Sequence, residues 1–311
     1  MNIGAQLDLH RCISKMPHSK QACYVRTRLF YLVYLCDHHC SLKFGRPPMT
    51  QEWRTLKEPT TFLHTRFSTH KDPGLISQVE LWSITRNVFE RFGADVESQL
   101  ATKEPAELAK FTDTFDGWWH TWSGLLALGS QDTDSSGNVQ ALYFHAAKLY
   151  LYSHIHRGSS SVEPIEQPEV ADLHRRFRAS ALSVLREMVD RGTSLMDLPS
   201  YFSTMLAFAT VALVRSIREE TTANHPEAQE IVRLLRRLTE NLRAIKIPEA
   251  SSHPLVGVAK GMDQMAETLQ IADHNFEIGA DMTIDGDLFT EDIWNFDFTE
   301  FGGNWMAFDD H

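Results

Sequence analysis

The stretch CDHHCSLKFGRPP, residues 36–48, decides between two interpretations of the N-terminal part of this chain. Cys36 and Cys40 lie four residues apart and flank two histidines, a set of ligand types that suits zinc. The same stretch runs into Gly45 and two prolines, which is typical of the end of a helix. The first interpretation predicts a metal site, and the second predicts a structural helix.

The residues around this stretch favour the helix. Apolar residues recur at steps of three and four over residues 19–42, which predicts a helix with one broad apolar face. The residues expected on that face are Cys23, Arg26, Phe30, Val33, Asp37 and Cys40, with Leu29, Leu32 and Cys36 beside them. A zinc site needs three or four ligands, and Cys12 and Cys23 lie apart without C-x2-C spacing. We therefore expect no metal here, and cysteines and histidines that pack or lie on the surface.

Helical periodicity continues through the rest of the chain. It covers residues 75–92, 104–128, 138–156, 169–191, 200–218, 226–245 and 253–271, with no comparable period of two. The fold class predicted is all-α, an irregular multi-helix domain with about nine helices. Residues 1–15 also have an amphipathic pattern, with Ile3, Leu7 and Leu9 but no N-cap before them. We therefore expect that the chain continues upstream of Met1.

Composition and charge narrow the class of protein. The chain has 311 residues, 42% of them hydrophobic, and four cysteines confined to residues 12–40. No run of about 18 apolar residues and no secretory leader is found, so we expect no membrane span and reduced thiols inside the cell. Through Lys260 there are 30 basic and 28 acidic residues, but residues 261–311 hold 13 acidic and no basic ones. Such asymmetry indicates an interaction tail.

The signature RTRLFYLVYLCDHHCSLKFGRPPM, residues 26–49, resembles the fungal-specific regulatory domain of Zn2Cys6 binuclear-cluster transcription factors. In that family an Arg, an apolar helix, an Asp, a Ser and Gly-Arg-Pro follow in this order. The matching residues here are Arg26 (or Arg28), Asp37, Ser41, Gly45, Arg46 and Pro47. GAQLDLHR (4–11), QVELWSI (78–84), LYFHAAKLYLYSHIHRG (142–158) and YFSTMLAFATVALV (201–214) are similar to other helices of the domain. With GAQLDLHR, the signature is closest to the subgroup that activates secreted-protease genes in filamentous fungi.

The resemblance implies a nuclear transcriptional activator that is not an enzyme. It predicts a regulatory domain over residues 1–271, truncated at its N-terminus. The family's zinc and its DNA contacts belong to an N-terminal six-cysteine module that this chain lacks, so we expect no cofactor here and no DNA binding by this chain alone. The resemblance leaves a homodimer open.

Residues 272–311 form the predicted transactivation tail. Within residues 281–311, nine carboxylates alternate with aromatic residues, a pattern typical of acidic activation domains that are disordered until they bind a coactivator. We expect binding to order a short helix, which would present apolar anchors to the transcription machinery. The candidate anchors are Leu288, Phe289, Ile293, Trp294, Phe296, Phe298, Phe301 and Trp305. The alternative is a final helix that packs on the body.

A second class of function stays open from the residues alone. Trp118, Trp119 and Trp122 suggest an all-α small-molecule binding protein, or a metal-dependent enzyme if the 36–40 helix held an ion. Three tryptophans within five residues cannot all face one way on a helix, so core anchors are the expected role. The chain has no H-E-x-x-H, no G-x-S-x-G and no inward D-D-x-x-D cluster, so no catalytic residues are predicted.

Overall fold

The structure is a computed structural model that describes residues 19–44, 46–50, 56, 58–93, 104–129, 139–156, 168–219, 226–245 and 254–278. Every element within these ranges is helical, and none of them contains a strand. The predicted all-α class is confirmed. None of the described helices is apolar over a long enough stretch to cross a membrane.

The chain divides into two compact units, Met1–Phe177 and Arg178–His311. The division falls within α7 (Pro168–Arg191). The single regulatory domain over 1–271 and the separate tail over 272–311 remain predictions.

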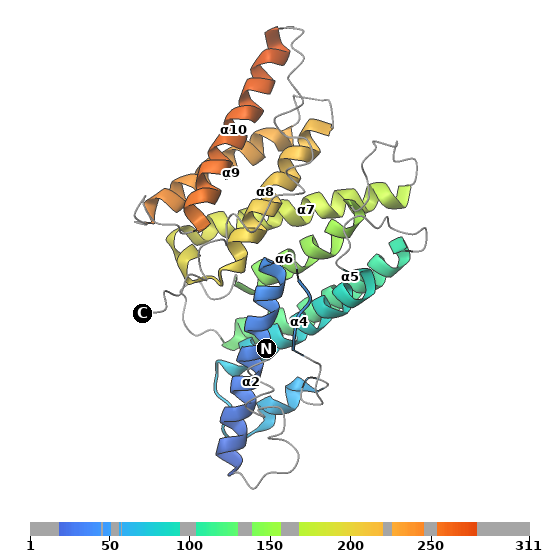
Figure 1. The fold of residues 1–311 in the computed structure, drawn as a ribbon, viewed down its shortest axis with the longest axis vertical. Coiled ribbons are helices and arrows are strands. Elements are labelled where there is room, and N and C mark those ends of the chain that lie inside the picture. Colours follow the sequence, from blue (N-terminus) through green and yellow to red (C-terminus); the bar gives the residue numbers. More distant parts are fainter. Residues whose placement is uncertain are drawn as a thin grey trace, which may run out of the picture. The chain divides into compact units, whose positions relative to one another are not determined.

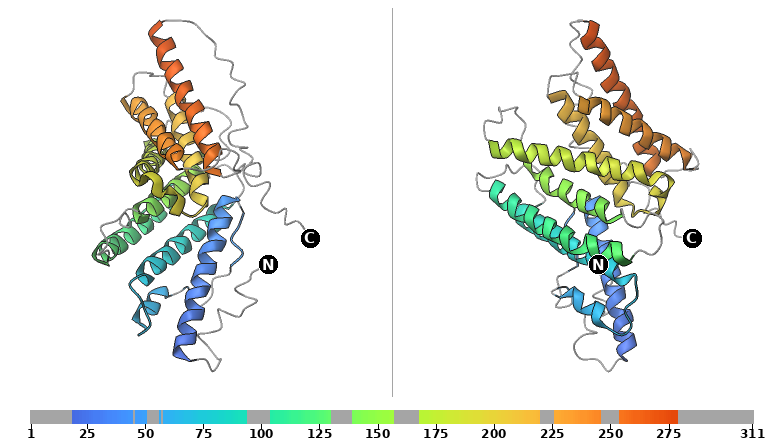
Figure 2. Two further views of the ribbon diagram at one scale, coloured as in Figure 1. Left: turned by 90° about the vertical axis from the view of Figure 1, so that its left-hand side faces the viewer. Right: turned by 180° about the vertical axis from the view of Figure 1, so that it is seen from behind.

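The first unit is arranged around α4 (Asp72–Phe92). This helix packs against α2 (Lys20–Lys43), the short 3-10 helix η2 (Pro59–His64), α5 (Glu104–Gly129) and α6 (Val139–Ser153). Figure 1 and the left view of Figure 2 show α4 between α2 and α5. The 3-10 helix η3 (His154–His156) follows α6 directly. Fully buried large side chains from all four α-helices fill the core between them: Tyr31, Tyr34, Ile76, Leu81, Leu108, Phe115, Trp122, Leu142 and Tyr152.

The second unit is a smaller helical group. It contains η4 (Gly192–Asp197), α8 (Tyr201–Glu219), α9 (Pro226–Ala244) and α10 (Pro254–Ile278). In this unit α10 packs against α8 and α9, and η4 packs against α9 (Figure 1). The side chains buried among these helices include Leu206, Leu213, Ile231, Leu235, Leu238 and Met262.

Proline and glycine set many of the helix boundaries. Pro168, Pro226 and Pro254 each begin a helix, where the missing N–H leaves no bond unmade. Gly192 follows α7 with φ of 55°, a left-handed conformation that glycine adopts without a steric penalty. The predicted ranges agree with the structure to within a few residues, except that α10 continues to Ile278 instead of ending at Ile271.

Candidate functional site

The signature residues lie on α2 and on the turn that follows it. Ser19 caps the helix, because its Oγ accepts a hydrogen bond from the Ala22 N–H at 3.1 Å. At the other end the Phe44 N–H donates to the Cys40 carbonyl at 3.0 Å. Lys43 in the last turn places a positive charge near the negative end of the helix dipole. The local sequence therefore fixes both ends of α2.

A polar clamp made by Asp37, Ser41, Arg46, Thr50 and Arg86 holds the turn after α2. Asp37 Oδ2 accepts a hydrogen bond from the Thr50 N–H at 2.6 Å, and Ser41 Oγ donates to the Arg46 carbonyl. Arg86 of α4 donates from Nη1 to the Thr50 carbonyl at 2.7 Å. Asp37 and Ser41 thus each hold the turn that follows α2. The clamp joins both ends of residues 46–50 to helices.

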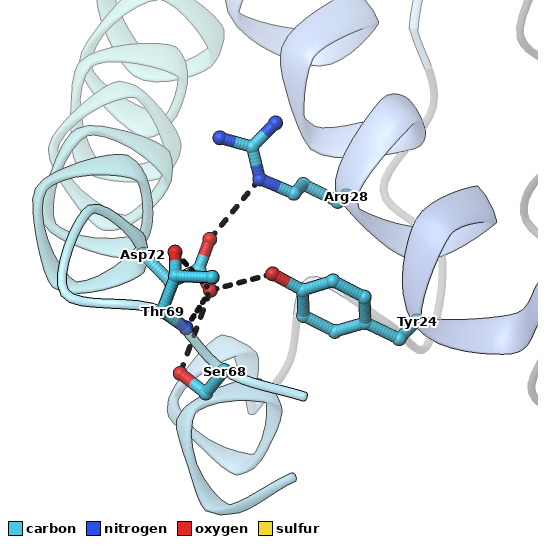
Figure 3. Close-up of polar contacts among 5 residues, drawn as sticks. All are labelled: Tyr24, Arg28, Ser68, Thr69 and Asp72. Atoms are coloured by element: carbon cyan, nitrogen blue, oxygen red, sulfur yellow. Dashed lines mark hydrogen bonds and ion pairs between the residues drawn. The ribbon is translucent and has the colours of Figure 1, made fainter. Parts of the chain in front are cut away.

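Asp72 joins α2 to the start of α4 (Figure 3). Its side chain is fully buried and accepts from Tyr24 Oη at 2.7 Å and from Arg28 Nε at 3.1 Å, both on α2. The Thr69 N–H and hydroxyl donate to the same carboxylate at 2.7 and 3.1 Å, and Ser68 Oγ lies 3.5 Å away. One carboxylate therefore fastens α2, the loop before α4 and the first turn of α4 together.

These contacts shift two pKa values. Burial raises the pKa of Asp72, but the hydrogen bonds from Thr69, Tyr24 and Arg28 outweigh burial and leave that pKa below its ordinary value. Burial, together with the negative charge of Asp72, raises the pKa of Tyr24. Both groups therefore keep their usual protonation states at neutral pH, which preserves the bond between them.

The two histidines of the signature pack inside the first unit. His38 Nδ1 lies 2.9 Å from the Tyr34 carbonyl, and its ring centroid lies 6.0 Å from that of Trp82. His39 meets the edge of Trp82 at 5.1 Å between centroids. Burial lowers the pKa of both histidines to about 4, so both rings are neutral at physiological pH.

The buried face of α2 differs from the predicted one. The residues it buries are Thr27, Phe30, Tyr31, Tyr34, Leu35, His38 and Ser41. Leu29, Leu32, Cys36 and Cys40, which we expected on or beside the core face, are exposed. That part of the prediction was wrong, because apolar residues surround α2 almost completely and their spacing does not select one face.

The cysteine pair of the signature is exposed. Cys36 and Cys40 form no disulfide, and burial raises the pKa of the Cys36 thiol. Within the described ranges no three His, Cys, Asp or Glu side chains gather closely enough to hold a metal ion. The expectation that this chain carries no zinc remains a prediction.

The tryptophans of α5 serve the core of the first unit. Trp118 Nε1 donates to the Ser77 carbonyl at 2.8 Å, and Trp122 Nε1 donates to Glu80 Oε2 at 2.7 Å. Both side chains are buried, and Trp119 stacks on Phe144 at 5.0 Å between centroids. The two buried indoles donate to α4, which agrees with their predicted role as core anchors.

The structure places most of the signature residues and adds others. Arg26 is half-buried on α2, Arg46 and Pro47 are exposed in the turn, and Gly45 lies outside the described residues. The arginine that pairs with Asp72 is Arg28. Sequence reasoning missed Tyr24, Asp72, Thr50 and Arg86. The Asp-Pro pair at residues 72–73 was the available signal, since proline at the first turn marks a helix start.

The other predicted sites fall beyond the described ranges. The N-terminal segment 1–18 and all eight candidate anchors of the tail, between residues 288 and 305, lie there. The division between body and tail and the roles of these anchors are therefore proposals.

Fold and signature together define an all-α protein in which Asp37, Ser41 and Arg46 hold the turn after a long helix. The chain is similar to the transcriptional activator of proteases prtT of Emericella nidulans. The two chains are 29% identical over 281 residues, which cover 86% of this chain and 42% of that protein. The chain thus spans less than half the length of this relative. No family model matches the chain, and no solved structure matches it significantly.

This similarity confirms the resemblance predicted from residues 26–49. It extends well beyond the signature, because the aligned length covers most of both compact units. The chain is therefore similar to a fungal transcriptional activator of proteases over most of its residues.

Proposed function

We propose that this chain is the regulatory and activating part of a transcriptional activator that controls genes for secreted proteases and peptidases. The similarity of 86% of the chain to the activator of proteases prtT carries this proposal. The polar contacts of α2 support a structural role for the signature, since Asp37 and Ser41 are each occupied by bonds within the protein. Such a helical body regulates and presents other segments and performs no catalysis.

The acidic tail is the part that recruits the transcription machinery in this proposal. Residues 281–311 carry nine carboxylates and no Lys or Arg, and the aromatic residues stand between those carboxylates. Mutual repulsion of the carboxylates keeps the aromatic side chains hydrated and apart. An apolar coactivator groove then binds Leu288, Ile293, Trp294 and Phe298 as anchors on a short induced helix, and the remaining anchors extend the contact.

In this proposal a separate module binds DNA. The proposal assigns DNA contact and zinc to a six-cysteine module outside these 311 residues, and it assigns no cofactor to this chain. The body works in the nucleus. Nothing in the described residues favours the small-molecule alternative, because both buried indoles of α5 donate to protein groups.

A reporter assay tests the proposal. Residues 1–311 and, separately, residues 272–311 are fused to a heterologous DNA-binding domain over a reporter gene. We expect both fusions to exceed the DNA-binding domain alone, with the tail the stronger if the body restrains it. Reporter output at background from both fusions would overturn the proposal.

A further inference from the structure

Two exposed thiols lie one helical turn apart on α2. Cys36 and Cys40 are both exposed and form no disulfide. Side chains four residues apart on a helix point the same way, with about 5–6 Å between their Cβ atoms. The left view of Figure 2 shows α2 at the edge of its unit, with α4 on one side. The pair therefore presents two sulfurs to solvent from one face of a packed helix.

The two sulfurs are close enough to influence each other. Partial burial raises the pKa of Cys36, and the neighbouring Cys40 raises that pKa further, because two negative sulfurs side by side repel each other. Cys36 is therefore a protonated thiol at neutral pH. Within the described part of the chain, neither of the two sulfurs makes a hydrogen bond. A ligand that binds both sulfurs thus displaces no contact within the protein.

The surface beside the pair is apolar. Leu32 lies one turn before Cys36, and Leu29 lies a further three residues back on the same side of α2. These two leucine side chains are 38% and 42% exposed. A ligand held by the two sulfurs would lie next to Leu32, where an apolar group on the ligand loses contact with water. The site therefore suits a ligand that combines a thiol-binding centre with an apolar substituent.

The geometry of the pair selects the kind of thiol-binding centre. Sulfur is a soft ligand and binds soft acceptors. A structural zinc site uses four ligands, so two thiols do not complete one. A linear two-coordinate ion such as Cu(I) needs sulfurs on opposite sides of it, whereas Cys36 and Cys40 point the same way. Trivalent arsenic is pyramidal, so it takes two sulfurs from one side and keeps its third position for an organic group.

We propose that Cys36 and Cys40 form a binding site for trivalent arsenicals that carry one apolar substituent. With phenylarsine oxide, two As–S bonds form, the As–O double bond breaks, and the two thiol protons leave with that oxygen as one water molecule. Arsenic and sulfur keep their oxidation states, so the step needs no oxidant or reductant. After the first As–S bond, the second thiol is present at an effective concentration of about the millimolar range, which favours closure of the ring.

Titration of the full chain with phenylarsine oxide tests this site. Cys12→Ser and Cys23→Ser remove the other two cysteines, so that Cys36 and Cys40 are the only thiols. Glutathione is added in excess, because a single thiol of the protein then loses the arsenical to it while a chelating pair retains the arsenical. The adduct is counted by intact-mass spectrometry, and circular dichroism checks that each variant is folded.

Two further variants in the same background separate spacing from the number of thiols. The matched control carries Cys40→Ser with Gln21→Cys, which keeps two exposed positions but places them about 22 Å apart along α2. The rescue variant carries Cys40→Ser with Leu32→Cys, which restores two exposed positions four residues apart. Both variants have the same number of thiols as the 36/40 pair.

We expect the 36/40 pair to bind one arsenical per chain, with an apparent dissociation constant roughly 100-fold lower than that of the 21/36 control. The 32/36 rescue variant should bind more tightly than the control by a similar factor. Equal dissociation constants for the 36/40 pair and the control would overturn the site. A rescue variant that binds no better than the control would also overturn it, because the four-residue spacing would then not hold the arsenical.

A labelling experiment on the natural chain covers the case in which the serine variants do not fold. The chain is incubated with phenylarsine oxide and then with iodoacetamide, and the labelled cysteines are identified by mass spectrometry of proteolytic peptides. We expect Cys36 and Cys40 to be protected together. Labelling of both cysteines at the rate seen without the arsenical would contradict the proposal.

Discussion

At the scale of single residues, Asp72 holds the first unit together more directly than any signature residue. Its carboxylate is buried and accepts from Tyr24, Arg28 and Thr69. Asp72→Asn removes the charge that these donors face, so we expect a loss of roughly 2–3 kcal/mol in the free energy of unfolding. Urea unfolding measures this loss in the free energy of unfolding. The exposed Asp113→Asn is the control, and equal effects of the two changes would refute the assigned role of Asp72.

Because the pKa of Asp72 is depressed in the folded state, its ionised form stabilises the fold. That contribution is present above the ordinary aspartate pKa of 3.8 and is lost as the pH falls through the lower, folded-state pKa. At acid pH, the free energy of unfolding should therefore decrease less steeply with falling pH in Asp72→Asn than in the unchanged protein.

His38 makes the free energy of unfolding depend on pH in a higher pH range than Asp72 does. Its folded-state pKa is about 4, against an ordinary 6.5, so the unfolded chain takes up a proton first as the pH falls. We expect the free energy of unfolding to decrease between pH 6.5 and 4, by up to about 3 kcal/mol for this residue. His38→Phe should flatten that slope in pH-dependent urea titrations, and the exposed His70→Gln should retain it. An unchanged slope in His38→Phe would show that His38 does not titrate as described.

Residue-scale contacts were only partly predictable from sequence. The end of α2 at Lys43, shortly before two prolines, and the packing role of the tryptophans follow from local chemistry. The partners of Asp72 on α2, Tyr24 and Arg28, lie 48 and 44 positions away in sequence, and that pairing depends on how α2 and α4 pack. No local pattern encodes such a pairing, although the Asp-Pro start of α4 marked one half of it.

At the scale of elements, the turn after α2 depends on the clamp made by Asp37, Ser41, Arg46, Thr50 and Arg86. Asp37→Ala removes the acceptor of the Thr50 N–H, so we expect faster amide exchange at Thr50 and a loss of about 1–2 kcal/mol. Hydrogen exchange with site resolution makes the measurement. Glu90→Ala removes only an exposed partner of Arg86 and should change stability by less than about 0.5 kcal/mol. Unchanged exchange at Thr50 in Asp37→Ala would contradict the clamp.

The positions of the helices were predicted well, but the side of the helix that faces the core was predicted less well. Periodicity placed every described α-helix, because each long helix buries some apolar stripe. It failed on the orientation of α2, where tyrosines, His38 and Ser41 face the core while Leu29 and Leu32 face outward. Apolar residues on both sides carry no orientational information without the neighbouring helices.

At the scale of the whole molecule, we propose a helical body and a charged tail, and we expect no metal in either. We expect purified chain, after chelation and buffer exchange, to contain far less than one zinc per chain by elemental analysis. Cys36 and Cys40 would supply at most two thiolates, fewer than a structural site uses. One zinc per chain surviving chelation would reverse the interpretation of residues 36–48.

The central claim is that the acidic tail activates transcription through its aromatic anchors. Its most direct test is Trp294→Ala with Phe298→Ala in residues 1–311 fused to a heterologous DNA-binding domain, with reporter output and circular dichroism measured together. The account predicts that reporter output falls close to that of the DNA-binding domain alone while helical content is unchanged. Full reporter output from the double variant would contradict the anchor assignment.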